Sequence, residues 1–393
     1  MHKLKVVIKG YFGYDNIGDD AILEAMIDSI RSEIPKAEIV ILCSNPTLIA
    51  DRYKVRAISL DLKRNFYIIS KELFKSDVFI LGGGGLFSND SPLRILSKLL
   101  YLFMAKFLCV KKIVVYSVGV DPLINKLSRL LMRIFLNHCV SILSVRDTES
   151  ALVLKKAGIK KEIFVYRDSA FSLSNRDEDA ERILRSVGIS FDIPYMVIAI
   201  AKPWNLEKEP DKAERYASFL SGCSCVINMF MDAHPGLNVV FIPFFYPYDL
   251  EVALEIFKNI NNKNTFHILY LRNKPKIVKS IIGHSSIVLG MRYHSVVFSI
   301  STSTPLAAIS YGPKIDSLLK KCSVIQYSER LGIRKSDFFK EEKDVDFGSL
   351  YNKLEEVYVK RELVKSRIEE GFLFIKGEMK PIGKLLKEIL VFK

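Results

Sequence analysis

The chain lacks the features that mark a disulfide-stapled or metal-clustered protein. It has 393 residues but only 6 cysteines, which are too few for a fold stapled by disulfides. Cys223 and Cys225 form a C-x-C pair, and no second pair of Cys or His follows at zinc-finger spacing, so the sequence predicts no metal site. Reduced thiols in a cytoplasmic protein are the simplest interpretation.

Long apolar runs are absent as well. The most apolar stretch covers residues 93–110, but Arg94, Lys98 and Lys106 interrupt it, and it falls short of the ~20 apolar residues that a membrane span requires. The N-terminal MHKLKVVIKGYFG is typical of a strand that leads into glycines, without the apolar core or cleavage site of a signal peptide.

The composition is that of a globular protein with a basic surface. Hydrophobic residues make up 49% of the chain and charged residues 26%, and the length predicts two or three domains. Lys and Arg number 58 against 44 Asp and Glu, a formal charge of +14. Such an excess favours anionic partners, which include nucleic acid, phosphorylated metabolites and acidic lipid headgroups, without choosing among them.

Short Val/Ile-rich runs alternate with helical patterns, which indicates βαβ units around buried parallel sheets. We expect strands at 5–9, 38–42, 78–81, 113–118, 142–145 and 163–166, and a second series at 195–199, 239–243, 267–271, 287–290 and 306–310. The sequence therefore predicts an α/β protein with two Rossmann-like domains facing a cleft, at residues 1–175 and 192–328, followed by a charged helical tail at 329–393. In such sheets, ligands bind beyond the carboxyl ends of the strands.

Two glycine-rich segments follow strands of the first domain. The first is GYFGYDNIGDDAIL at residues 10–23, whose spacing fits neither a dinucleotide fingerprint nor a Walker loop. It can bind an anion at a helix N-terminus, or it is a tight turn with Asp19 or Asp20 as a helix cap. The second is the run of glycines at residues 82–85, which is either an anion-binding nest or a turn under the next helix.

Charged side chains follow other expected strands. Arg146 stands at a strand end, before Asp147 as a helix cap, and its planar fork suits a phosphate or a carboxylate; the alternative is a surface ion pair. Asp168 lies at a similar edge. In the second domain, Arg292 and His294 of GMRYHS open a helix, and Lys314 follows the next strand. Together they favour a small polyanionic ligand.

In order, the segments GYFGYDNIGDDAIL, FILGGGGLF, SVRDTESALVLKKAG, RDSAF, GMRYHSVVFSIS and ISYGPK resemble the polysaccharide pyruvyl transferase family over about residues 5–315. The nearest likeness is to members that pyruvylate cell-wall polysaccharides for S-layer anchoring. The resemblance implies a fold like that of GT-B glycosyltransferases, phosphoenolpyruvate as donor substrate with no further cofactor, and a pyruvate ketal on a sugar as product. Residues 119–122 are poorer in glycine than the family pattern.

The resemblance places the family's functional residues on this chain. Its S-V-R-D arginine falls on Arg146, its R-x-H pair on Arg292 and His294, and its lysine on Lys314, which implies donor binding and proton transfer. We expect His294 to transfer a proton and Asp19 and Asp168 to orient or deprotonate the acceptor. The remaining substrate contacts are assigned to Gly13, Asn16, Gly18, Gly84 and Gly85.

Two rival functions and one membrane question stay open. A GT-B glycosyltransferase with a nucleotide-sugar donor would share the fold, whereas a basic nucleic-acid-binding protein would cluster its cations and aromatics on one face. The acceptor saccharide is either free or lipid-linked.

The helices expected near 93–110 and 123–140 combine apolar faces with basic flanks, as an interfacial helix at the inner face of a membrane does. The alternative is that both faces pack on the sheet.

Overall fold

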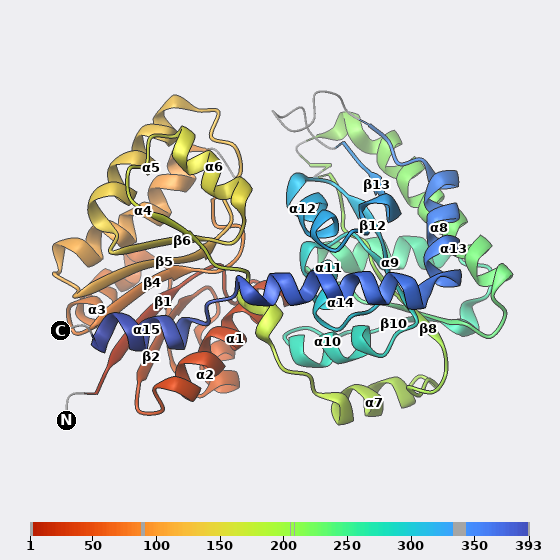
Figure 1. The fold of residues 1–393 in the computed structure, drawn as a ribbon, viewed down its shortest axis with the longest axis horizontal. Coiled ribbons are helices and arrows are strands. Elements are labelled where there is room, and N and C mark those ends of the chain that lie inside the picture. Colours follow the sequence, from red (N-terminus) through yellow and green to blue (C-terminus); the bar gives the residue numbers. More distant parts are fainter. Residues whose placement is uncertain (1–2, 88–90, 205, 208, 333–342, 392–393) are drawn as a thin grey trace. The chain divides into compact units, whose positions relative to one another are not determined.

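The computed structural model describes residues 3–87, 91–204, 206–207, 209–332 and 343–391. The chain divides into two compact units (Figure 1). Unit 1 contains Met1–Tyr14, Asp19–Leu173 and Glu378–Lys393, and unit 2 contains Asp15–Gly18 and Ser174–Gly377. Each unit is built on one parallel sheet, so the predicted α/β class with two Rossmann-like domains is confirmed.

Unit 1 has a seven-stranded sheet in the order β3-β2-β1-β4-β5-β6-β7. Its strands are β1 (Lys5–Lys9), β2 (Glu38–Cys43), β3 (Arg56–Ser59), β4 (Val78–Gly82), β5 (Lys112–Val118), β6 (Ile142–Val145) and β7 (Ile163–Val165). Its helices are α1 (Ile17–Glu33), whose first two residues belong to unit 2, α2 (Pro46–Tyr53), α3 (Leu62–Phe74), α4 (Pro92–Phe107), α5 (Lys126–Cys139), α6 (Thr148–Lys156), the short η1 (Ser169–Ser172) and α15 (Ile382–Val391).

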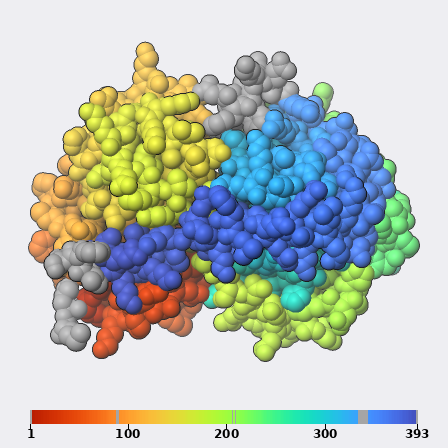
Figure 2. Space-filling view, viewed as in Figure 1, coloured from red at the N-terminus to blue at the C-terminus, as the bar shows by residue number. Residues whose placement is uncertain are grey.

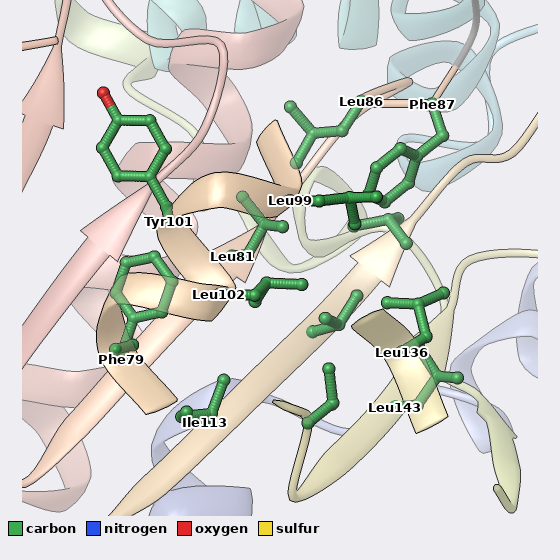
Figure 3. Packing of buried hydrophobic residues seen from close by; sticks show 14 of the residues in the cluster. Phe79, Leu81, Leu86, Phe87, Leu99, Tyr101, Leu102, Ile113, Leu136 and Leu143 are labelled. Carbon is green, nitrogen blue, oxygen red and sulfur yellow. The ribbon is translucent and has the colours of Figure 1, made fainter. Parts of the chain in front are cut away.

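The sheet of unit 1 has a helical layer on each face (Figure 1). Strand order reverses direction between β1 and β4, and right-handed crossovers then place α1 and α2 opposite α4, α5 and α6. Figure 3 shows the core under α4, where Leu99 and Leu102 meet Phe79 and Leu81 of β4 and Ile113 of β5. The other face also carries α15, whose dark-blue surface lies beside the red N-terminal residues in Figure 2.

Unit 2 has a six-stranded sheet in the order β10-β9-β8-β11-β12-β13. Its strands are β8 (Tyr195–Ala199), β9 (Asn238–Phe241), β10 (Phe266–Ile268), β11 (Ile287–Gly290), β12 (Leu306–Ser310) and β13 (Ser328–Arg330). Its helices are α7 (Asp177–Arg185), η2 (Pro210–Lys212), α8 (Ala213–Ala233), α9 (Tyr248–Lys258), η3 (Lys263–Thr265), α10 (Pro275–Gly283), α11 (Tyr293–Ser301), α12 (Pro313–Lys321), η4 (Ile325–Tyr327), α13 (Phe347–Val359) and α14 (Arg361–Gly377).

The division of the chain differs from the expected domain bounds in two places. Residues 177–185, expected near a boundary, form α7, and the backbone N–H of Arg176 donates to the Ser280 hydroxyl of α10 at 2.6 Å. The expected tail does not form a unit of its own. Its helices α13 and α14 belong to unit 2, and α15 belongs to unit 1, because their apolar side chains are buried against those units.

The first turn of α1 also differs from the sequence interpretation. The helix begins at Ile17, so Asp19 and Asp20 lie inside its first turn, and the expectation that either one caps it is wrong. Asn16 precedes the helix, and its Oδ1 accepts a hydrogen bond from the Gly18 N–H at 3.0 Å. Because the helix begins before Asp19 and Asp20, both carboxylates lie near the positive end of the helix dipole, where negative charge is stabilising.

Candidate functional site

Arg292 and His294 lie where β11 ends, beside the point at which strand order reverses in unit 2. The Ala199 carbonyl at the end of β8 accepts hydrogen bonds from the Met291 and Arg292 N–H groups, at 2.9 and 3.3 Å. These bonds fix the turn that leads into α11, with Arg292 just before the helix and His294 in its first turn. Such a switch point is where open α/β sheets bind their ligands.

The guanidinium of Arg292 is held by Asp249, a residue that sequence reasoning missed. Its Nε donates to Oδ2 of Asp249 at 2.8 Å, and its Nη2 donates to Oδ1. The Asp249 side chain is fully buried, and its Oδ2 also accepts hydrogen bonds from the Phe244 and Phe245 N–H groups. Burial disfavours the charged guanidinium, but Asp249 and Tyr311 outweigh it and raise the pKa of Arg292. The arginine is therefore charged and locked in orientation.

Lys314 joins the same group of side chains through Tyr311. The Lys314 ammonium lies 5.1 Å from the centre of the Tyr311 ring, at the start of α12, and the same tyrosine contributes to the raised pKa of Arg292. Because β11 and β12 are neighbouring parallel strands, their carboxyl ends bring the two cations to one edge of the sheet. Arg292 and His294 thus follow β11 and Lys314 follows β12, at the same edge of the unit 2 sheet.

The segment Asp15–Gly18 is packed against this edge as part of unit 2. Asn16 pairs with Phe245 in an isolated antiparallel bridge, and the Ile17 N–H donates to the Phe244 carbonyl at 2.9 Å. A Cβ atom on Gly18 would lie only 2.0 Å from Nδ1 of His294. The motif therefore uses glycine to let a helix backbone lie directly against the histidine ring, and it places Gly18 beside His294.

Gly13 and Gly85 lie apart from the contacts described so far. Gly13 has φ +79°, and a Cβ there would meet the Asn45 backbone nitrogen at 2.9 Å and the Ser44 hydroxyl at 3.1 Å. Its conformation and its packing on the loop before α2 explain the glycine without a ligand. Gly85 is half-buried at the end of the glycine run.

At the edge of the first sheet, the structure brings together four of the predicted residues. Gly84 has φ +70°, and a Cβ there would lie 2.5 Å from Oδ1 of Asp19. The Gly84 carbonyl accepts a hydrogen bond from the Gly119 N–H at 2.8 Å. A Cβ atom on Gly119 would lie only 2.7 Å from the Arg146 guanidinium, so no side chain fits there. Asp19, Gly84, Gly119, Arg146 and Asp168 therefore form one contiguous group, which we call the unit 1 edge cluster.

Arg146 is buried between two carboxylates rather than paired at the surface. It is only 5% exposed, with Nε 3.4 Å from Asp147 Oδ2 and Nη1 3.8 Å from Asp168 Oδ2. Asp147 caps α6 as predicted, since its Oδ1 accepts from the Ser150 N–H at 2.7 Å. Asp168 accepts from the Ala170 N–H at 3.0 Å. The carboxylates offset the positive charge of Arg146, while their own orientation is fixed by helix caps.

Three further residues of unit 1 were missed. Gly119 follows a break in the β5–β6 register, where Ser117 has φ +50°. Arg167 is buried and donates from Nε to Glu378 Oε2 at 2.6 Å, a contact between residues far apart in sequence. Lys9 ends β1, with its ammonium 4.7 Å from the centre of the Tyr101 ring. Burial, with a smaller effect of Lys98, lowers the pKa of Lys9 to about 7.

Metal ligands do not cluster in the part of the chain that the structure describes: no group of three or more His, Cys, Asp or Glu side chains there could hold an ion. Nor does any helix within those residues have the length and apolar character needed to cross a membrane.

Solved structures with the same architecture define the fold class. A UDP-GlcNAc 2-epimerase from Methanocaldococcus jannaschii matches with a TM-score of 0.64 and 14% identity, covering 100% of both chains. A putative UDP-N-acetylglucosamine 2-epimerase from Listeria monocytogenes matches with a TM-score of 0.63 and 12% identity over 94% of each chain. Anabaena HepE in complex with UDP-glucose matches with a TM-score of 0.60 and 10% identity over 99% of each chain. The fold is thus of the GT-B type, with two Rossmann-like domains.

The family follows from the sequence. The model of the polysaccharide pyruvyl transferase family matches residues 16–313, which include the unit 1 edge cluster, Arg292 and His294, whereas Lys314 is the residue directly after the match. The chain belongs to the polysaccharide pyruvyl transferase family. No curated protein shows significant sequence similarity to it.

Proposed function

We propose that the protein transfers the pyruvate unit of phosphoenolpyruvate onto a sugar of a polysaccharide, or of its lipid-linked precursor, as a ketal, with release of phosphate. The observation that carries the proposal is the grouping of Arg292, Lys314 and His294 at the ends of β11 and β12, in a chain of the pyruvyl transferase family. The S-layer-anchoring type remains our prediction for the subfamily.

The charges at this edge suit the proposed donor. Phosphoenolpyruvate carries a phosphate and a carboxylate on one small skeleton, so its site needs two cations a short distance apart. Arg292 and Lys314 are these two cations, and Tyr311 is a neighbour of both. Helices α11 and α12 add the positive ends of two helix dipoles. Because Asp249 fixes Nε and Nη2 of Arg292, we assign Nη1 to the donor.

The reaction balances without an oxidant or a reductant. The methylene carbon gains a proton and becomes a methyl group, and positive charge develops at C2. Two sugar hydroxyl oxygens form bonds to C2, while the bond from C2 to the phosphate oxygen breaks. Of the two protons that the hydroxyls lose, one balances the proton on the methyl carbon and the other leaves with phosphate. His294 is assigned the proton transfer, since it lies beside the cations in the first turn of α11.

The unit 1 edge cluster is proposed to orient the acceptor. Asp19 and Asp168 carry carboxylates that can accept hydrogen bonds from sugar hydroxyls, and Gly84, which has no side chain, lets the Asp19 carboxylate lie directly against the backbone. The buried Arg146 stabilises the charge of Asp168. A direct contact of Arg146 with the donor stays a prediction.

The test is phosphate release from phosphoenolpyruvate with and without a panel of acceptor saccharides. We expect phosphate to appear only with an acceptor, together with a product whose pyruvate is released by mild acid, as a ketal is. His294→Gln should lower kcat by about 10²–10⁴-fold with little change in the KM for phosphoenolpyruvate. Transfer from a nucleotide-sugar such as UDP-glucose, the ligand bound in the HepE structure, would favour the glycosyltransferase alternative and would overturn the proposal.

A further inference from the structure

Helix α4 has two apolar stripes, and only one of them is buried. Ile95, Leu99 and Leu102 belong to the core of unit 1. A second stripe, spaced alternately by three and four residues, faces solvent with side chains between 37% and 79% exposed. Its members are Leu93, Leu96, Leu100, Phe103 and Phe107. The alternative that the apolar residues of this helix pack on the sheet therefore holds for the stripe with Ile95, Leu99 and Leu102, but not for the exposed stripe.

Helix α5 repeats the arrangement beside it. Met132 and Leu136 are buried, whereas Leu127, Leu130 and Ile134 are between 46% and 52% exposed. The two helices are neighbours, and the rings of Phe103 and Phe135 lie 6.3 Å apart, edge to face (Figure 1). The exposed stripes of α4 and α5 are called the apolar patch below. Isolated exposed apolar residues are ordinary, but two adjacent stripes on one layer indicate an interaction surface.

The charged side chains of α4 and α5 have one sign. Neither α4 nor α5 contains an Asp or a Glu, and each contains three cations among its Lys and Arg residues. On α5, Lys126, Arg129 and Arg133 form an exposed stripe next to the apolar one. Near the end of this helix, Arg133, His138, Lys160 and Lys161 line a depression of about 600 Å³. Several cations on this surface can therefore contact an extended anionic partner at the same time.

We propose that the apolar patch and its basic border dock unit 1 on the surface of an anionic lipid bilayer. Exposed Leu and Phe side chains beside Lys and Arg are what an interfacial helix presents to lipid, and each cation near an anionic leaflet adds about 1 kcal/mol. A second copy of this chain is a poorer occupant, because a symmetric contact would bring two sets of cations together. The inference rests on unit 1 alone and holds whether or not the proposed reaction is correct.

The experiment is sedimentation of the full-length protein with vesicles. We expect it to pellet with vesicles rich in phosphatidylglycerol at low salt, to be released by high salt, and to stay in the supernatant with pure phosphatidylcholine. The variant Lys126→Gln/Arg129→Gln/Arg133→Gln should bind about a hundredfold more weakly, since each charge accounts for about fivefold. Phe103→Gln/Phe107→Gln should lose binding as well, because it removes the apolar contact.

Two variants of unit 2 serve as matched controls. Lys320→Gln/Lys365→Gln removes exposed charge, and Leu363→Gln/Leu373→Gln removes exposed apolar surface; both should bind like wild type. Circular dichroism and melting temperatures establish that every variant is folded. The proposal is overturned if wild type stays in the supernatant with anionic vesicles, if it binds phosphatidylcholine equally, or if the α4 and α5 variants bind unchanged. It is also overturned if those variants instead abolish a dimer in solution.

Discussion

At the scale of single residues, Gly18 is the position where the smallest change has the sharpest expected effect. A methyl group there would overlap the His294 ring, so Gly18→Ala must displace the imidazole. We expect kcat to fall at least about tenfold if His294 transfers the proton, with little change in melting temperature, because the ring rather than the backbone can move. The measurement is steady-state kinetics beside a thermal melt.

Gly377 provides the control for this substitution. It also lies in a helix, and a Cβ there meets nothing within 4 Å. Gly377→Ala should leave kcat unchanged. It should raise the free energy of unfolding by up to about 1 kcal/mol, because alanine has the higher helix propensity. If Gly18→Ala and Gly377→Ala have the same kcat, the position of the His294 ring beside Gly18 does not matter for catalysis.

Lys9 gives a prediction about stability and pH. Its pKa is about 7 in the folded protein, against 10.5 for an ordinary lysine. Between these values the unfolded chain binds more protons than the folded one, so the contribution of Lys9 to the free energy of unfolding rises with pH, by at most about 1.4 kcal/mol per unit. Lys9→Met should therefore be more stable than wild type near about pH 6, and its advantage should shrink toward about pH 9. Urea unfolding at several pH values measures the difference.

The exposed Lys3 is the comparison for Lys9. Lys3→Met should shift stability by a small amount that does not vary over this pH range. A difference between Lys9→Met and wild type that is independent of pH would show that the ammonium is solvated in the folded state.

At the scale of elements, the first turn of α9 and the start of α11 are joined by an ion pair, Asp249 with Arg292. Asp249→Asn keeps the size of the side chain but leaves a partly buried guanidinium without its counter-charge. We expect a loss of about 3–5 kcal/mol of stability. We also expect the KM for phosphoenolpyruvate to rise by about tenfold, because Arg292 is no longer held in place.

Another buried carboxylate separates the two effects. Glu329 on β13 is paired with Lys353, so Glu329→Gln should lower stability without changing the KM for phosphoenolpyruvate. If Asp249→Asn loses stability and keeps its KM, the ion pair is structural and Arg292 does not contact the donor.

The elements also show what sequence patterns can and cannot predict. Every strand interior to a sheet was expected, because buried parallel strands are continuous apolar runs. The two strands that were missed, β3 and β13, are edge strands with the polar sequences RAIS and SER. The predicted cations at β11 and β12 come together because adjacent strands end at one edge. Asp249, Gly119 and Glu378 could not be found in this way, since each acts through a contact distant in sequence that only the fold creates.

At the scale of the whole molecule, the two units exchange short segments of chain. Asp15–Gly18 belongs to unit 2 although unit 1 surrounds it in sequence, and Glu378–Lys393 returns to unit 1 after the whole of unit 2. The return is anchored by the Tyr116 hydroxyl, which donates to the Lys380 carbonyl at 2.8 Å, and by the Gly383 N–H, which donates to the Ser29 hydroxyl at 3.0 Å. The C-terminal residues are therefore part of the first Rossmann-like domain.

This exchange predicts that a change near the C-terminus weakens the unit built from the N-terminal half. Leu386 of α15 is fully buried, so Leu386→Ala should cost about 2–5 kcal/mol. Hydrogen exchange should quicken in β4 and β5 of unit 1 and stay unchanged in β8 and β11 of unit 2, because opening of a unit is governed by its own contacts. Leu373→Ala, at a position of α14 that is 69% exposed, should change neither. Equal loss of protection in both sheets after Leu386→Ala would mean that the two units unfold as one.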